Sequence, residues 1–186
     1  LEKLGQKDFL NALTLFEKNR DAERFGMKTV DSIVTACYEM GRVKTGALIV
    51  VERDIMLTEY QHTGIELDCI VSEQMLINIF EHNTPLHDGA VIVRGDRIVA
   101  ATCYLPLSEN MGLSKQLGTR HRAAVGMSEV SDALIICVSE ENGNVSYAMG
   151  GHITRGVSEA QLREQLIQLQ IDQQQQIQEQ SLHIGN

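Results

Sequence analysis

The segment Gly118-Thr119-Arg120-His121-Arg122 gathers side chains that can hold an anion. If Thr119 caps a helix, the three large donor side chains after it fall in the first turn. Free backbone N–H groups and the positive end of the helix dipole lie there too. Together with Lys115, the two arginines give a local charge of +3 in a stretch without acids. Because arginine forks suit phosphate oxygens, the pattern favours a phosphate-binding site over a solvated basic turn or a structural ion pair.

A second candidate is the loop Thr84-Pro85-Leu86-His87-Asp88-Gly89-Ala90, which runs into a predicted strand. A carboxylate beside an imidazole, here Asp88 beside His87, can bind a divalent metal or accept a proton. Gly89 permits the close approach of backbone or ligand, where a Cβ would obstruct it. The alternative is a tight turn in which Asp88 bonds its own backbone, and these residues alone favour that turn.

Two further candidates follow predicted strands. Ser139-Glu140-Glu141 ends an apolar run, where a carboxylate can join a metal site but is as often a solvated residue before the Asn142-Gly143 turn. In Tyr104-Leu105-Pro106 the aromatic ring could stack on a planar base, although a core tyrosine is commoner. Neither a P-loop nor a Rossmann GxGxxG motif is present, which excludes the two commonest nucleotide-binding loops.

The composition describes an acidic chain that can build an apolar core. It has 186 residues, 43% of them hydrophobic, and a formal net charge of −9, which argues against a protein that covers nucleic acid with positive charge. The longest apolar runs fall far short of the roughly 20 residues that a membrane helix needs. The four cysteines lie far apart among apolar neighbours, which predicts buried, reduced thiols rather than a zinc site.

Hydrophobic spacing and turn residues predict the elements that position these candidates. Thr29 is expected to cap a helix that ends near Gly41, and Ser72 to open a second one. The other predicted elements are a buried strand at 46–51, two hairpins that pair 90–93 with 98–104 and 134–139 with 145–148, a helix at 120–127, and a helix after the Ser158–Gln161 capping box. The pattern indicates a mixed α/β (α+β-like) domain, not a regular βαβ winding.

Three parts are expected along the chain. Residues 1–28 are predicted to form a lead-in helix or linker, residues 29–171 the folded domain, and residues 172–186 a Gln-rich tail that frays. The sequence begins at Leu1 rather than at a methionine, which favours a soluble piece of a longer protein.

The motifs Asp88-Gly89-Ala90 and Arg120-His121-Arg122 together resemble the signatures of the diadenylate cyclase (DAC, DisA_N-type) domain family. The likeness covers about residues 28–160 and extends through the segments 83–90, 103–108, 117–126 and 138–141. The lead-in and residues 46–53 look most like the membrane-anchored CdaA type, in which a few transmembrane helices precede the cyclase. This resemblance implies the DAC-domain fold, a mixed, largely antiparallel central sheet flanked by helices.

The resemblance also implies roles for individual residues. Asp88, Arg120, His121 and Arg122 would be catalytic, and Asp88 would hold a divalent metal with His87 and Glu140 as metal neighbours. Tyr104 would stack on adenine while the Leu105 backbone reads its edge. The other implied ATP-binding residues are Gly89, Gly118, Thr119 and Ser139, beside the Arg120-His121-Arg122 cluster.

The implied reaction condenses two ATP into cyclic di-AMP and releases two pyrophosphates, with Mg²⁺ or Mn²⁺ as cofactor. Because each ATP is both nucleophile and electrophile, and one chain carries one copy of each motif, the reaction needs a face-to-face homodimer. The resemblance further implies a bacterial parent protein anchored in the cell membrane, with its catalytic domain in the cytoplasm and a regulatory protein partner. Two alternatives stay open: a nucleotide-binding sensor without turnover, and a metal-dependent phosphohydrolase built on His87, Asp88 and Glu140.

Overall fold

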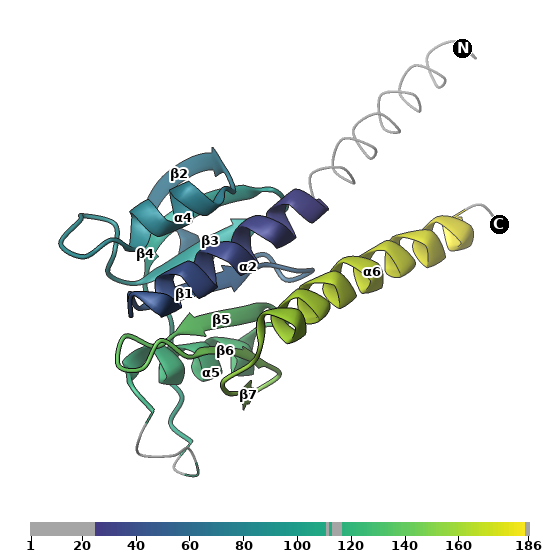
Figure 1. Cartoon of the computed structure of the whole chain (residues 1–186). Coiled ribbons are helices and arrows are strands. Elements are labelled where there is room, and N and C mark those ends of the chain that lie inside the picture. Colours follow the sequence, from purple (N-terminus) through teal and green to yellow (C-terminus); the bar gives the residue numbers. More distant parts are fainter. Residues whose placement is uncertain (1–24, 111, 113–116, 185–186) are drawn as a thin grey trace.

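The computed structural model describes residues 25–110, 112 and 117–184, which form one sheet with helices on both faces (Figure 1). Most of the predicted lead-in and Lys115 lie outside the described residues. In chain order the elements are α2 (Met27–Arg42), β1 (Ala47–Val51), α3 (Thr58–Gln61), β2 (Ile65–Ile70), α4 (Glu73–Phe80), β3 (Ala90–Arg94), β4 (Arg97–Cys103), α5 (Thr119–Val130), β5 (Leu134–Val138), β6 (Val145–Met149), β7 (His152–Thr154) and α6 (Glu159–Ile184).

The seven strands lie in the order β2-β4-β3-β1-β5-β6-β7. Only β1 and β3 pair in parallel, and the other neighbouring strands are antiparallel. Both predicted hairpins, β3–β4 and β5–β6, are present. The prediction of a mixed, largely antiparallel sheet flanked by helices is therefore confirmed.

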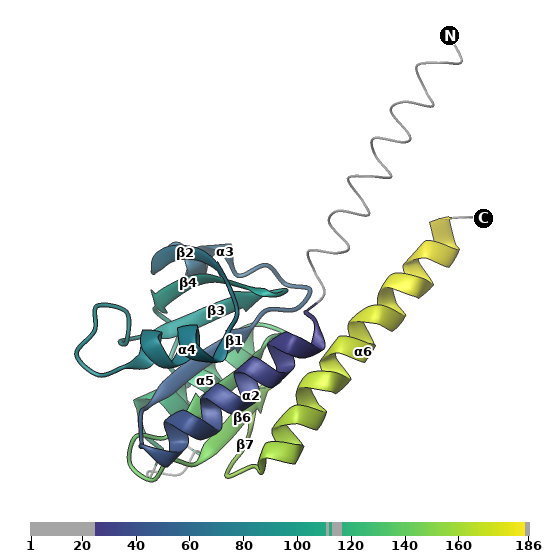
Figure 2. The ribbon, with the colours of Figure 1, turned by 45° about the horizontal axis from the view of Figure 1, so that its top comes forward.

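Helices cover both faces of this sheet, which explains why β1 and β5 are buried along their whole length. On one face α2, α4 and α6 pack against alternate residues of the central strands, among them Ile49 and Ile136. Figure 2 shows α2 and α6 side by side on this face. On the other face α5 packs against the intervening residues, among them Val50 and Ile135. The core is mostly aliphatic, and Phe25 and Phe80 are buried in it on the α2 face.

Two of the predicted helix starts are displaced. The cap of α2 is Gly26, not Thr29, and the Thr29 hydroxyl instead donates to an Asp96 carboxylate oxygen at 2.5 Å. The cap of α5 is Gly118, so that Thr119 is the first helical residue and forms no side-chain cap. In both places the helix begins earlier than a search for capping hydroxyls predicts, because glycine also serves at this position.

Other local predictions are confirmed. The Ser72 hydroxyl accepts from the Met75 N–H at 3.2 Å and caps α4. The Ser158–Gln161 capping box closes in both directions, at 2.8 and 3.3 Å. α6 continues to Ile184, and the fraying of the chain from Asp172 stays a prediction. The short elements α3, β2 and β7 were not predicted.

The four cysteines are free, and three of them are buried as predicted. Burial raises the pKa of Cys37 and Cys137 to about 12 and that of Cys103 to about 11, which keeps these thiols protonated. Cys69, on the edge strand β2, is only half-buried, contrary to the prediction.

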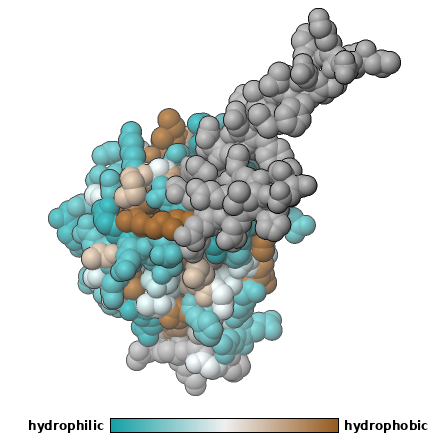
Figure 3. Space-filling model, turned by 90° about the vertical axis from the view of Figure 1, so that its right-hand side faces the viewer, coloured by the Kyte–Doolittle hydropathy of each residue, from teal (hydrophilic) through white to brown (hydrophobic). Residues whose placement is uncertain are grey.

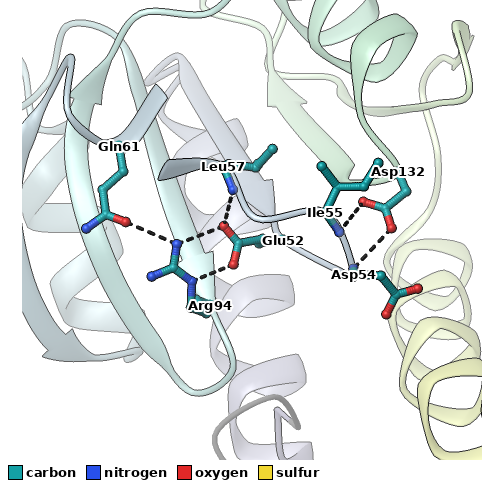
Figure 4. Close-up of polar contacts among 7 residues, drawn as sticks. All are labelled: Glu52, Asp54, Ile55, Leu57, Gln61, Arg94 and Asp132. Carbon is teal, nitrogen blue, oxygen red and sulfur yellow. Dashed lines mark hydrogen bonds and ion pairs between the residues drawn. The ribbon is translucent and has the colours of Figure 1, made fainter. Parts of the chain in front are cut away.

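A buried ion pair fixes the loop that follows β1. The Glu52 carboxylate accepts from Arg94 Nε at 2.5 Å and Nη2 at 2.9 Å, and from the Leu57 N–H at 2.8 Å (Figure 4). Asp132, beyond α5, accepts the N–H groups of Asp54 and Ile55 at 3.0 and 3.2 Å. These contacts tie together the sheet edge at which β1 ends.

The face that lies on the right-hand side of Figure 1 has a largely hydrophilic surface with separate hydrophobic areas, where it is not drawn in grey (Figure 3). Ile55 and Met56, in the loop after β1, are exposed. Within the part of the chain that the structure describes, no helix is long and apolar enough to span a bilayer.

Candidate active site

The register of the strands brings most of the predicted site residues to one edge of the sheet. Ala47 pairs with Val138, and Val138 with Val145, so β1 and β6 begin where β5 ends. The parallel pairing of Ile49 with Val91 and the pairing of Ala90 with Cys103 place the start of β3 and the end of β4 at the same edge. We call this the site edge; the residues just outside its strands are Gly46, Asp88, Gly89, Tyr104, Leu105, Ser139, Glu140 and Asn144.

A pocket opens at the site edge between the start of α5 and the loop 139–144. It holds about 90 Å³, less than the roughly 300–1,000 Å³ of pockets that enclose a whole drug-sized ligand. Its size suits a few phosphate groups rather than an entire nucleotide. The lining residues are Gly118, Thr119, Arg120, His121, Val138, Ser139, Glu140, Glu141, Asn142, Asn144, Ser146, Arg155 and Gly156.

Arg120 is held in place from two sides. Its Nη1 lies 2.6 Å from the Glu140 carboxylate, which realises the ion pair that the sequence left open as an alternative. Its guanidinium also packs over Gly46, where an added Cβ would come within 2.7 Å of Nη1. The Arg120 guanidinium therefore has a fixed position beside the start of β1, and Glu140 offsets part of its positive charge.

His121 is half-buried in the same pocket. Burial lowers its pKa, the positive charge of Arg155 lowers it further, and the negative charge of Glu141 raises it. Burial dominates, so the imidazole is neutral at neutral pH and offers one N–H donor and one acceptor.

Ser139 organises the loop that closes the pocket. Its hydroxyl accepts from the Glu141 N–H at 3.3 Å, and its carbonyl accepts from the Gly143 N–H at 2.9 Å. Asn142 and Gly143, predicted as a two-residue turn, lie within the longer loop 139–144 that these bonds hold. The loop presents Glu140, Glu141 and Asn142 at the surface.

The loop before β3 positions Asp88 at the site edge. The His87 Nδ1–H donates to the Thr84 carbonyl at 2.6 Å, which leaves the Nε2 lone pair free. Gly89 has φ +100°, and a Cβ there would lie 2.7 Å from the carbonyl carbon of Thr102 in β4. The exposed Asp88 makes no bond to its own backbone within the described residues, so the tight-turn interpretation that its own loop favoured is wrong.

The segment after β4 is tied to α5. The Ser108 N–H donates to the Arg122 carbonyl at 3.0 Å, and a Cβ on Gly126 would come within 2.2 Å of the Pro106 carbonyl oxygen. Tyr104 is 74% exposed, and its N–H donates to the Thr63 hydroxyl at 2.9 Å. The alternative of a core tyrosine is therefore wrong, and the ring is free to stack on a ligand.

Some predicted residues are not brought together within one chain. Asp88, His87, Gly89, Tyr104, Leu105 and Arg122 do not line the pocket that contains Arg120 and Ser139. Within the described ranges, no three His, Cys, Asp or Glu side chains form a group that could hold a metal ion. The metal set Asp88, Glu140 and His87 stays a prediction.

Sequence reasoning missed several pocket residues, above all Arg155. It follows β7, a strand that was not predicted, and β7 pairs with β6 from His152 opposite Met149 to Thr154 opposite Tyr147. The adjacent Gly150 and Gly151, both at positive φ, form the turn between these strands. That Gly-Gly pair was the available signal for a third antiparallel strand, and hence for a cation at its end.

Comparison with known proteins finds relatives over most of the chain. A family model described as DAC, DisA bacterial checkpoint controller nucleotide-binding, matches residues 34–153. The Cyclic di-AMP synthase CdaA of Bacillus subtilis is 49% identical over 166 residues, which are 89% of this chain and 59% of that protein. A Diadenylate cyclase of Listeria monocytogenes is 47% identical over 167 residues, 90% of this chain and 59% of that protein. The chain thus spans 59% of the length of each of these relatives.

Two solved structures share the fold. The crystal structure of a double mutant of DacA from Staphylococcus aureus has a TM-score of 0.76 and 46% identity, and the match covers 77% of this chain and 96% of that one. A hypothetical membrane spanning protein from Bacillus cereus has a TM-score of 0.69 and 40% identity, covering 79% of this chain and 71% of that one.

Proposed function

We propose that this chain, which belongs to the DAC family of nucleotide-binding domains, is the catalytic part of a diadenylate cyclase that condenses two ATP into cyclic di-AMP and two pyrophosphates. One observation carries the proposal. The strand register brings the loop of Asp88 and Gly89 to the same sheet edge as the pocket that starts α5 with Thr119 and Arg120.

The order of residues along the site edge supports one way of placing ATP. From β4 through β3, β1 and β5, the residues at the edge are Tyr104, then Asp88, then Arg120 over Gly46, then Ser139. Adenine would stack on Tyr104, the ribose and α-phosphate would lie near Asp88, and the outer phosphates would enter the pocket. Neighbouring strands lie about 4.8 Å apart, so an extended nucleotide can follow several of them.

In the proposed reaction, the 3′-oxygen of one ATP attacks the α-phosphorus of the other. A P–O bond forms, the bond to the β-phosphate oxygen breaks, and pyrophosphate leaves; a second, reciprocal step closes the ring. Asp88, exposed at the edge, would accept the proton of the attacking hydroxyl. Arg120 and the backbone N–H groups at the start of α5 would hold the charge that develops on pyrophosphate, and the neutral His121 would donate one hydrogen bond.

The donor set suits a divalent cation such as Mg²⁺ or Mn²⁺. Asp88 offers a free carboxylate and His87 a free Nε2, and both are ligands that such ions accept. Glu140, placed by its ion pair with Arg120, would approach from the other side of the edge. Since one chain gathers no group of three candidate ligands among its described residues, phosphate oxygens would complete the coordination. A bound cation would offset negative charge on the reacting phosphates.

The stoichiometry requires two copies of the chain. One site edge lays out one ATP, and the second nucleotide, with its 3′-hydroxyl, would be held by a second copy facing the first. The proposal therefore includes a homodimer whose site edges face each other. We further propose that residues 29–171 form the catalytic domain. The parent protein would be anchored in a bacterial membrane, with this domain in the cytoplasm and under the control of a protein partner. The likeness to a protein described as membrane spanning supports the anchoring.

Incubation with ATP and Mn²⁺ or Mg²⁺, followed by mass spectrometry, tests the proposal. We expect cyclic di-AMP, with a specific activity that falls on dilution as dimers dissociate. Bound nucleotide without any product at concentrations that permit dimers would establish a sensor instead. Release of ADP or AMP, independent of protein concentration, would establish a phosphohydrolase.

A further inference from the structure

We propose that Arg155 binds the β- and γ-phosphates of ATP and is a phosphate ligand outside both signature motifs. The proposal rests on the proposed function, because it takes the pocket at the start of α5 to hold the triphosphate. Arg155 lines this pocket together with Arg120, His121 and Ser139.

The end of β7 places Arg155 on the far side of the pocket from Asp88. β7 runs antiparallel to β6, and after Thr154 the chain stays beside β6. The Gly156 N–H donates to the Ser146 hydroxyl at 3.3 Å, and the Val157 N–H donates to the Val145 carbonyl at 2.9 Å. Val145 begins β6 at the site edge, so Arg155 is held next to that edge.

The charges in the pocket leave Arg155 available to a ligand. Arg120 forms an ion pair with Glu140, whereas the exposed Arg155 has no ion pair or hydrogen-bond partner within the described residues. Its positive charge is nevertheless close enough to His121 to lower the pKa of that imidazole. A guanidinium without an internal partner, at the rim of a phosphate-sized pocket, suits the bidentate recognition of phosphate oxygens.

The strand order determines which phosphates Arg155 meets. Asp88 precedes β3, and Arg155 follows β7, with β1, β5 and β6 between them. At about 4.8 Å per strand, the reacting α-phosphate near Asp88 cannot also reach Arg155. The terminal phosphates, which leave as pyrophosphate, are the part of ATP that extends in this direction.

The dissociation constants of three ligands, measured for wild type and for Arg155→Gln, test the assignment. The three ligands carry different parts of the nucleotide. 3′-Deoxy-ATP carries the triphosphate but lacks the attacking hydroxyl, pyrophosphate is the departing group, and cyclic di-AMP has no β- or γ-phosphate. We expect Arg155→Gln to lower the affinity for 3′-deoxy-ATP and for pyrophosphate by about 10- to 100-fold, because one charged hydrogen-bonded contact is lost. Binding of cyclic di-AMP should stay within about twofold of wild type.

Arg97→Gln is the matched control. It removes the same charge, but Arg97 begins β4 at the opposite end of the sheet and pairs with Asp68. It should leave the binding of all three ligands unchanged, and Arg155→Lys should recover part of the affinity for 3′-deoxy-ATP.

The possible results separate the role of Arg155 from the proposed function. Unchanged binding of 3′-deoxy-ATP by Arg155→Gln, or an equal loss for all three ligands, would overturn the role of Arg155 and leave the proposed function standing. A wild-type protein that binds 3′-deoxy-ATP but makes no cyclic di-AMP from ATP would overturn the proposed function while the role of Arg155 is still measured. A wild-type protein that binds none of the ligands would overturn both.

Discussion

Gly89→Ala tests whether the glycine of the Asp88 loop is required by packing. The backbone at Gly89 has φ +100°, and an added Cβ would lie 2.7 Å from the Thr102 carbonyl carbon and 2.9 Å from its Cα. To restore ordinary contact at 3.4 Å, the Thr102 carbonyl carbon must retreat by about 0.7 Å. β4 cannot yield easily there, because Thr102 itself already has φ +56°.

The expected cost has two parts. A positive φ costs a residue with a Cβ roughly 1–2 kcal/mol, and forcing extra volume into a packed contact costs about 1–3 kcal/mol. We expect urea unfolding to show a loss of about 2–5 kcal/mol, which leaves a domain of ordinary stability folded. Because a shift of about 1 Å at a reacting group can cost 100-fold in rate, we expect cyclic di-AMP formation to fall by about 10- to 100-fold.

Gly150→Ala separates the two parts of this cost. Gly150 also has a positive φ, +56°, but a Cβ there would meet nothing within 4 Å, and it lies in the β6–β7 turn away from the site edge. The Gly150→Ala variant should lose only about 1–2 kcal/mol of its free energy of unfolding and form cyclic di-AMP at the wild-type rate. If both variants unfold at the same urea concentration and cyclise ATP equally well, the packing argument for Gly89 is wrong.

Three further predictions concern charged or titrating groups. Asp88→Asn should abolish cyclic di-AMP formation while 3′-deoxy-ATP still binds, and turnover near the wild-type level would refute the assigned role of this exposed carboxylate. Glu52→Ala should lower the free energy of unfolding by about 3 kcal/mol, because it removes the counter-ion of the half-buried Arg94 and leaves the Leu57 N–H without its acceptor; an unchanged urea midpoint would contradict this. Since burial lowers the pKa of His121 in the folded state, the unfolded state binds the proton more tightly, and stability should fall as the pH drops from about 8 to about 5. His121→Gln should flatten that dependence, and parallel stability curves would count against it.

Local signals in the sequence located most of the elements that hold the site. The alternation around Gly95, the apolar run before Ser139 and the serine caps each depend on neighbours a few residues away, and the structure bears them out. The helix starts at Gly26 and Gly118 were missed because a glycine cap carries no side-chain signature.

The sequence could not show which strands are neighbours, and this strand order decides which residues meet at the site edge. No local pattern tells that β1 lies between β3 and β5, yet this order puts Asp88 and Ser139 at one edge with Gly46 between them. The contact of Gly46 with the Arg120 guanidinium joins residues that are far apart in the sequence. Arg155 was missed because it follows the three-residue strand β7; the Gly150-Gly151 turn signals such a strand, but only its pairing with β6 places Arg155 at the site edge.

The charged side chains at the two edges of the sheet differ in whether they have partners within the chain. At the edge where β1 ends, the Glu52 carboxylate is buried and accepts three hydrogen bonds from Arg94 and Leu57, so it holds the loop and is not exposed to a ligand. At the site edge, Asp88 and Arg155 are exposed and have no partner within the described residues. An unpaired charge gains nothing for the isolated fold, and a chain with a net charge of −9 could supply Arg155 with an acid. The arrangement therefore supports the proposal of a ligand that brings opposite charge to both ends of the site edge: a polyphosphate toward Arg155 and a divalent cation toward Asp88.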